Sequence, residues 1–253
     1  MLFTYFDIET SGLESDADVL SFAYMLATEN LEVKRAETLY FWKEGVTKWS
    51  EEAYEVNGLS KEFLRQYESQ YEDNLKKMYI VLSYADLVGY NSGYVGKDGM
   101  VHGFDFPRCQ SFLIRNGLYE PKVSGFYDVM RMLGKRVKLD VAFEKYGLSP
   151  SLADTFNRVY FKTDSVSHVA SYDVVRAAML FQQLYNEQES STSATFYEEM
   201  EQRSEDEYKL FFNSLGELMV RNLYDNTEYS INDFKEKDTS MFEKMMANPA
   251  SYM

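Results

Sequence analysis

Residues 2 to 8 form an aromatic and β-branched run next to an acidic pair, and this run limits the fold more than any other stretch. Such residue types are typical of a buried strand. Asp7 and Glu9 are two positions apart, so on a strand both side chains lie on the same face. Two bare carboxylates this close repel each other and are costly inside a sheet unless a cation neutralises them. The run therefore predicts a divalent metal with oxygen ligands, most often Mg²⁺ or Mn²⁺.

The next residues, Thr10, Ser11, Gly12 and Leu13, end the strand in a tight turn with small side chains. An acidic pair alone is common on solvated strands, but Asp-x-Glu-Thr-Ser-Gly-Leu after an apolar strand is much more specific. It resembles the first motif of the DEDDh-type 3′–5′ exonucleases, the DnaQ-like branch (DNA polymerase III epsilon) of the ribonuclease H-like superfamily. The resemblance implies an α/β, ribonuclease H-like fold, with a central mixed five-stranded sheet flanked by helices.

Composition narrows the class of protein without deciding its function. With 253 residues, 45% of them hydrophobic, the chain is long enough to bury a full core. The single cysteine, Cys109, allows no internal disulfide and suits a reducing cytoplasm. No segment has the ~18 consecutive apolar residues of a membrane span, and no basic region precedes the first strand as in a secretory signal. We therefore expect a cytoplasmic protein without membrane contact.

The net charge of −15 at first argues against a nucleic-acid partner. The charge is unevenly distributed, however: residues 108 to 162 hold ten Lys/Arg and five Asp/Glu, a local +5. Metal ions bound to the acidic site would also reach phosphate directly. An acidic protein of this kind can therefore still process nucleic acid.

The residues after the first strand continue the expected sheet. Residues 19–27 and 31–42 read as two strands joined by a short turn at Glu29 and Asn30, which gives three antiparallel strands. Ser50 is a candidate N-cap for a helix, and residues 73–82 have an amphipathic pattern. A fourth strand follows over residues 84–90. Between these elements, Val-Asn-Gly-Leu-Ser at 56–60 resembles the family's His-Gly-Ile element, with Asn57 in place of the His.

The second motif is interrupted by an insertion. Gly-Tyr-Asn at 89–91 resembles the family element that precedes a Phe-Asp pair, but here twelve residues with four glycines, 92–103, come first. We expect a flexible loop or hairpin at the rim of the site. Phe104-Asp105 follows, before a helix over 108–116. Asp105 is the predicted second-motif carboxylate, and Asp98 is its rival, a glycine-flanked residue more typical of a solvated turn.

The third motif lies at the start of a long apolar helix. Residues 123–132 contain a fifth strand ending near Asp128, which we interpret as structural, and residues 138–148 resemble the next family helix, capped by Gly147. Asp173 then opens a helix whose apolar positions recur at helical spacing. His168 is five residues earlier, about 140° away on a helix, so it must lie in the preceding loop. This order resembles the family's His-x₄-Asp motif.

The resemblance implies a two-metal exonuclease that releases nucleoside 5′-monophosphates from 3′ ends. Two Mg²⁺ ions, replaceable by Mn²⁺, would be held by Asp7, Glu9, Asp105 and Asp173, with His168 as the general base. Thr10, Ser11, Leu13 and Asn91 would contact the terminal nucleotide. Single-stranded DNA is the favoured partner. The alternatives are an exoribonuclease that trims RNA or short oligonucleotides, and a catalytically silent binding module.

The last part of the chain carries none of these motifs. We expect an exonuclease domain over 1–186 and an acidic, Met-rich helical extension over 187–253. A polar linker is expected over 186–193 and a docked helix over 208–223, where apolar residues recur at helical spacing. Methionines and a phenylalanine between 241 and 246 suggest a further short helix. This extension is a candidate binding surface for a protein partner.

Overall fold

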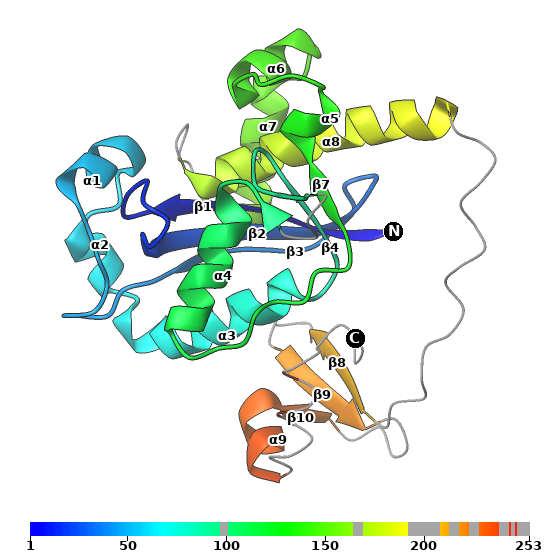
Figure 1. Ribbon diagram of the computed structural model, residues 1–253. Helices are drawn as coiled ribbons and strands as arrows, with labels where there is room; N and C mark the ends of the chain where they lie inside the picture. The colour runs from blue at the N-terminus through cyan, green and yellow to red at the C-terminus, as the bar shows by residue number, and fades with distance from the viewer. Residues whose placement is uncertain are drawn as a thin grey trace. The chain divides into compact units, whose positions relative to one another are not determined.

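The structure is a computed structural model that describes residues 1–96, 101–163, 169–191, 208–212, 218–222 and 228–237, together with positions 243 and 246 (Figure 1). The chain divides into two compact units, Met1–Ser191 and Thr192–Met253, and each is described here by itself. Among the described residues, no helix has the length and apolar character needed to cross a membrane.

The first unit is built on a mixed five-stranded sheet, as predicted. Its strands are β1 (Leu2–Thr10), β2 (Val19–Thr28), β3 (Val33–Tyr40), β4 (Asp86–Gly89) and β7 (Phe126–Asp128), in the spatial order β3-β2-β1-β4-β7. The first three strands pair antiparallel, whereas β4 runs parallel to both β1 and β7. The central strand, β1, therefore carries the acidic pair at its carboxyl end.

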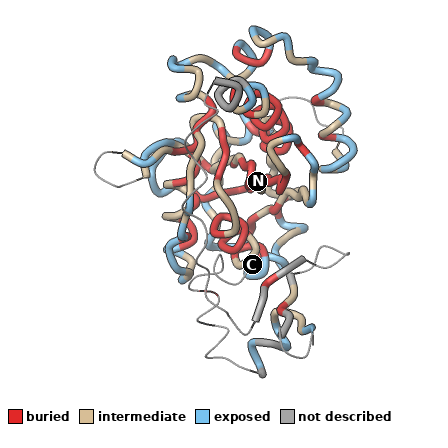
Figure 2. The backbone as a smooth tube through the Cα atoms, turned by 90° about the vertical axis from the view of Figure 1, so that its right-hand side faces the viewer, coloured by how far each residue is buried: buried red, intermediate tan, exposed pale blue. Residues whose placement is uncertain are grey.

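The two faces of β1 face different helices, because alternate side chains of a strand point to opposite sides. Phe3 and Tyr5 pack against Phe181 of α8 (Ala170–Ser191), with ring centroids 5.1 and 5.7 Å away. On the other face, Phe6 contacts Phe22, 5.9 Å away. Helices α3 (Tyr71–Leu82) and α4 (Asp105–Arg115) cover that second face (Figure 1). Buried residues accordingly gather along the strands and the helices against them (Figure 2).

Two short helices begin at serine caps, and the first of these caps, Ser50, was predicted. The hydroxyl of Ser50 accepts a hydrogen bond from the amide of Ala53 at the start of α1 (Glu51–Asn57). The hydroxyl of Ser60 accepts one from the amide of Phe63 at the start of α2 (Lys61–Arg65). Each such cap is worth roughly 1 kcal/mol. The other short helices of this unit are η1 (Glu68–Gln70), α5 (Val129–Met132), α6 (Leu139–Lys145), α7 (Pro150–Phe156) and the π-helical η2 (Asn157–Phe161).

Several expected boundaries shift. Helix α4 begins at Asp105 instead of 108, and Gly117 follows its end with φ 81°. The strand expected within 123–132 is only Phe126–Asp128, because Asp128 then caps α5 by accepting from the amide of Arg131. The insertion forms a hairpin, with β5 (Tyr94–Val95) antiparallel to β6 (Val101–His102). Residues 97–100, including Asp98, lie outside the described residues.

Two expectations for the end of the chain are wrong. The linker expected over 186–193 is helical through Ser191, because Glu and Gln are good helix formers and extend α8. The helix expected over 208–223 is instead a pair of antiparallel strands, β8 (Tyr208–Phe212) and β9 (Leu218–Asn222). Buried Leu210 faces buried Val220, so the apolar residues follow a strand register. Both segments are rich in aromatic and apolar residues, and the sequence between them has turn-forming Asn213, Ser214 and Gly216.

The second unit completes its sheet with a third strand. β10 (Glu228–Ser230) pairs antiparallel with β9, and α9 (Ile231–Lys237) follows directly. The hydroxyl of Ser230 accepts from the amide of Asp233 and caps this helix. The extension is therefore not purely helical. The methionine-rich helix expected near the end falls outside the described residues except at positions 243 and 246.

Candidate active site

Asp7 and Glu9 lie at the carboxyl end of β1, on the face that also carries Phe3 and Tyr5. Both residues are intermediate in exposure, whereas residues 3–6 and Ile8 of the same strand are buried. Their pairing partners on β2 are Ala23 and Ser21, which bring no compensating charge. The strand period thus aims two carboxylates at the same region, next to the helix that carries Asp173.

Asp105 is the first residue of α4 and is only 5% exposed. Its Oδ2 accepts a 2.6 Å hydrogen bond from the hydroxyl of Ser92, on the chain leaving β4. The amide of Phe104 donates to the carbonyl of Asn91 at 3.1 Å, and that of Phe106 donates to Ser92 at 2.9 Å. The inserted hairpin therefore leaves and returns at one point, directly beside Asp105.

Two glycines make that closure sterically allowed. Gly103 has φ 130°, and a Cβ added there would lie 2.5 Å from the Cα of Gly93. An L-residue at position 103 would be strained at this φ, and its Cβ would clash with the backbone of Gly93. We call this contact the hairpin neck. It holds the two sides of the hairpin together directly beside Ser92 and Asp105.

Asp173 lies in the first turn of α8 and is the fourth acidic residue of this region. Its Oδ1 is 4.0 Å from Nη1 of Arg176, one helical turn later. Arg176 is 9% exposed and also pairs with Asp140, while Phe143 and Tyr172 lie 4.9 and 5.2 Å from its guanidinium. Asp173 therefore lies near the buried guanidinium of Arg176, a neighbour that the sequence did not predict.

The four carboxylates affect one another electrostatically. Burial, and then the charges of Asp105, Asp173 and Glu9, raises the pKa of Asp7 well above its usual value. Burial, and then Asp173 and Asp105, raises the pKa of Glu9 to about 8. Burial raises the pKa of Asp105 to about 7, although the Ser92 hydroxyl and the charge of Arg108 oppose the shift. Raised values at several adjacent carboxylates are typical of a functional site.

The chemistry of these donors fits a hard divalent cation, since all are carboxylate oxygens and their charge is incompletely balanced. Among the described residues, however, no group of three or more His, Cys, Asp or Glu side chains already stands close enough to hold a metal ion. Holding an ion here would require these carboxylates to lie closer together.

The residues expected to contact the substrate differ in their exposure to solvent and in whether their polar groups are already hydrogen-bonded. Leu13 is 79% exposed, whereas the amide of Ser11 donates to Asp18 at 2.9 Å and its hydroxyl accepts from the Asp18 amide. The hydroxyl of Thr10 donates to Gly12 at 2.7 Å. Asn91 has φ 60° and donates its amide to Asp128. In this structure the polar groups of Ser11 and Thr10 stabilise the turn, and Leu13 is the side chain open to solvent.

Two further residues hold this region together. Arg108 donates to the carbonyl oxygens of Leu13 and Phe104 and lies 3.6 Å above the Phe104 ring, so it links the turn after β1 to α4. Asn57, the residue at the family's His position, donates from Nδ2 to the carbonyl of Thr10 at 3.2 Å. Arg108 lies three residues after Asp105 on α4, so the two side chains are neighbours, a relation that the expected helix start at 108 did not predict. His168, the expected general base, lies outside the described residues.

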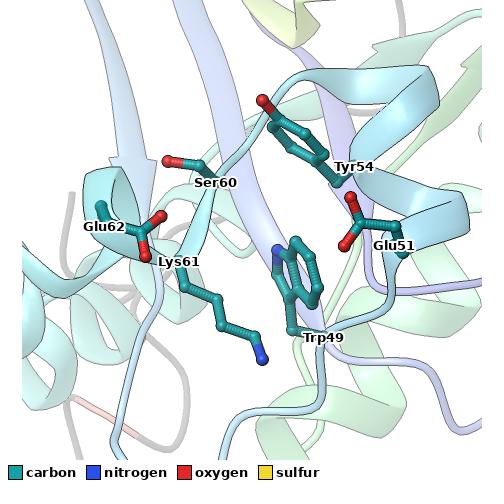
Figure 3. A pocket seen from close by; sticks show the side chains of 6 residues that line it. All are labelled: Trp49, Glu51, Tyr54, Ser60, Lys61 and Glu62. Atoms are coloured by element: carbon teal, nitrogen blue, oxygen red, sulfur yellow. The ribbon is translucent and has the colours of Figure 1, made fainter.

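A separate hollow lies between α1 and α2. Its volume is about 320 Å³, and it is lined by Trp49, Glu51, Tyr54, Ser60, Lys61 and Glu62 (Figure 3). The ammonium of Lys61 is 4.5 Å from the centroid of the Trp49 ring, and Trp49 Nε1 donates to Leu59. None of the predicted site residues lines this hollow. It is distinct from the carboxylate region.

Comparison with known proteins identifies the fold. No protein-family profile matches the sequence, and no curated protein matches it either. Among solved structures, exonuclease I from Methylocaldum szegediense matches with a TM-score of 0.52 and 19% identity, over 75% of this chain and 41% of that one. Exonuclease I of E. coli, in complex with a dT13 oligonucleotide, matches with a TM-score of 0.51 and 16% identity, over 75% and 42%.

A third solved structure, cell-death related nuclease 4, matches with a TM-score of 0.50 and 12% identity, over 74% of this chain and 64% of that one. The chain thus spans about two fifths of the exonuclease I chains. The mixed sheet order, the parallel β1–β4–β7 half and the flanking helices agree with these matches. The first unit therefore has the α/β, ribonuclease H-like fold of these nucleases.

Proposed function

We propose that this protein is a metal-dependent 3′–5′ exonuclease that hydrolyses nucleic acid, with single-stranded DNA as its favoured substrate. The observation that carries the proposal is the group of four carboxylates, Asp7, Glu9, Asp105 and Asp173, whose charges act on one another at the carboxyl end of the central strand. Structures of similar fold are nucleases, and one of them is a complex with a dT13 oligonucleotide.

In this proposal the four carboxylates hold two Mg²⁺ ions, which Mn²⁺ can replace. Bound there, such ions activate a water molecule and neutralise charge on the scissile phosphate. Ser92 orients Asp105 by its hydrogen bond, so that the other oxygen of this carboxylate remains available. His168 takes the proton of the attacking water as general base, because an imidazole titrates near neutral pH. The product is a nucleoside 5′-monophosphate.

The turn after β1 holds the terminal nucleotide in the same proposal. The exposed side chain of Leu13 wedges against the last base, and Arg108 fixes it by binding the Leu13 carbonyl. Thr10 and Ser11 shape the turn, and Asn91 borders the site opposite it. An apolar wedge fixed at its backbone separates a terminal base from its neighbour without requiring a particular base.

The proposal is tested with 5′-labelled single-stranded and duplex DNA, and with RNA of the same sequence, each with Mg²⁺, Mn²⁺ or chelator. We expect stepwise shortening from the 3′ end and release of 5′-mononucleotides only when a metal is present. An RNA rate above the DNA rate would favour the exoribonuclease alternative. No shortening of any substrate with Mn²⁺ would exclude the exonuclease proposal and favour a binding module.

Replacing His168 by Ala is expected to lower kcat by about 10²–10⁴-fold, the range in which general bases contribute. Mn²⁺ affinity, measured by calorimetry, is expected to stay close to that of the unchanged protein because His168 is not a proposed ligand. His102→Ala, which changes the other histidine of the chain, is the matched control and should keep kcat on a dinucleotide. A collapse of Mn²⁺ affinity in the His168 variant would contradict the assignment of a base.

A further inference from the structure

The segment between Asp128 and Asp140 concentrates positive charge in an otherwise acidic protein. It contains Arg131, Lys135, Arg136 and Lys138 and no acidic residue, whereas the whole chain has a net charge of −15. All four side chains are exposed. In the part of the chain that the structure describes, none of them forms an ion pair with an Asp or Glu side chain. We call these four residues the basic strip.

The basic strip is anchored to the end of β4, next to the carboxylates. The hydroxyl of Tyr90 donates to the carbonyl of Val137 at 2.7 Å. Asp128, which caps α5, also accepts from the amides of Asn91 and Gly93 at 3.2 and 3.3 Å. The charge of Asp128 in turn contributes to the raised pKa of Asp105. The strip is thus held against the same chain segment that positions Asp105.

An aromatic side chain lies at the hairpin end of the strip. The guanidinium of Arg131 is 3.6 Å from the centroid of the Tyr94 ring, in β5. The His102 ring of β6 is stacked on Tyr94 at 5.5 Å with an interplanar angle of 30°. The Tyr94 ring thus packs against a cation and a second ring, and the cation–π contact holds the Arg131 guanidinium at this end of the strip.

A charge run on a protein surface usually serves only solubility. That explanation fits the acidic majority of this protein but not a strip of opposite sign, whose cations reduce the net charge. Its local field would instead attract a polyanion to this one side of an acidic molecule. Because the strip lies beside Asp105, one of the proposed metal ligands, the polyanion it would attract is a nucleic-acid substrate.

We propose that the basic strip binds the phosphodiester backbone of a single-stranded nucleic acid, upstream of its 3′ end. This inference rests on the proposed exonuclease function for the direction of the strand. The strip binds phosphates without reading sequence, and the Tyr94 ring, which lies against the Arg131 guanidinium and the His102 ring, holds Arg131 at the hairpin end of the strip. A dinucleotide is too short to engage both the carboxylates and the strip, so the strip determines affinity for longer strands.

Binding is measured without catalysis, by fluorescence anisotropy of a labelled 20-nucleotide DNA strand in excess chelator at several salt concentrations. The test variant combines Lys135→Gln, Arg136→Gln and Lys138→Gln. The matched control combines Lys34→Gln, Lys43→Gln and Lys122→Gln, three exposed lysines outside the strip with the same change in charge. Thermal melting checks that both variants fold.

The strip variant is expected to bind on the order of 10–100-fold more weakly, with the salt slope of log K reduced by about 2, since each lost phosphate contact removes about 0.7 for a single strand. The control variant should change affinity less than about twofold.

Equal affinities and slopes for the strip variant and the unchanged protein would overturn the proposal. An equal loss on a blunt duplex would overturn its single-strand part. If the strip variant binds more weakly but the unchanged protein hydrolyses nothing with Mn²⁺, the strip proposal stands and the exonuclease proposal fails. If the protein hydrolyses the 20-nucleotide strand and the strip variant has the same KM as the unchanged protein, the exonuclease proposal stands and the strip proposal fails.

Discussion

Replacing Asp7 by Asn is expected to abolish the proposed turnover on every 3′ end and to raise the melting temperature of the metal-free protein. Asn has nearly the same shape but cannot supply the negative charge that a metal site needs. We expect a loss of about 10³-fold or more, as for other groups that stabilise charge in a transition state. The gain in stability arises because Asp7 is placed where burial and three neighbouring carboxylates disfavour its charged form.

Activity assays with Mn²⁺ and melting curves in chelator check the two parts of this result. Asp16→Asn is the matched control, because Asp16 is an exposed carboxylate that pairs with Lys48 on the surface. An exposed pair of this kind contributes little to stability. The control should keep turnover and gain no stability. An Asp7 variant with nearly unchanged turnover would show that Asp7 is not a metal ligand.

In chelator, the melting temperature is expected to fall by about 5–10 °C between about pH 5.5 and about pH 8.5. The folded protein raises the pKa of Glu9 to about 8 and of Asp105 to about 7, above the values near 4 of an unfolded chain. Between these limits the folded state binds more protons than the unfolded state. Stability is therefore fully present below the unfolded pKa and is lost as pH rises through the folded pKa values.

Saturating Mn²⁺ should flatten this dependence at the alkaline end, since a bound cation favours the ionised carboxylates. Differential scanning calorimetry across the pH range, with chelator and with Mn²⁺, gives both curves. The Asp7→Asn variant in chelator should show a shallower slope than the unchanged protein. A melting temperature that rises from acid to alkaline pH in chelator would mean that these carboxylates are ionised at little cost, and the buried-charge argument would fail.

The parts that the sequence predicted well depend on local patterns. The alternation along residues 2–8 places Asp7 and Glu9 on one face of a strand whatever the rest of the chain does, and Ser50 caps a helix through neighbouring atoms. The choice of Asp105 over Asp98 as the second-motif carboxylate stays a prediction, since Asp98 lies outside the described residues. The pairing of Ser92 with Asp105 was not predictable, because it joins residues on both sides of an insertion.

The errors have a common cause. The helix expected over 208–223 rested on apolar spacing that a pair of short strands also satisfies, and the choice depends on cross-strand partners such as Leu210 and Val220. Likewise, the sequence could not show that the amide of Ser11 is bonded to Asp18, since that contact depends on how the turn closes. Arg176 was missed because its buried position beside Asp173 depends on Phe143 and Asp140 of another helix.

The hairpin neck has a consequence for how such a protein can change. Since the backbones of Gly93 and Gly103 lie in contact, the inserted segment leaves and rejoins the chain at one point beside Asp105. Because the entropy of closing a loop grows only slowly with its length, the segment beyond the neck can be lengthened, shortened or exchanged at little cost. The sequence between the two glycines can therefore change without displacing Asp105.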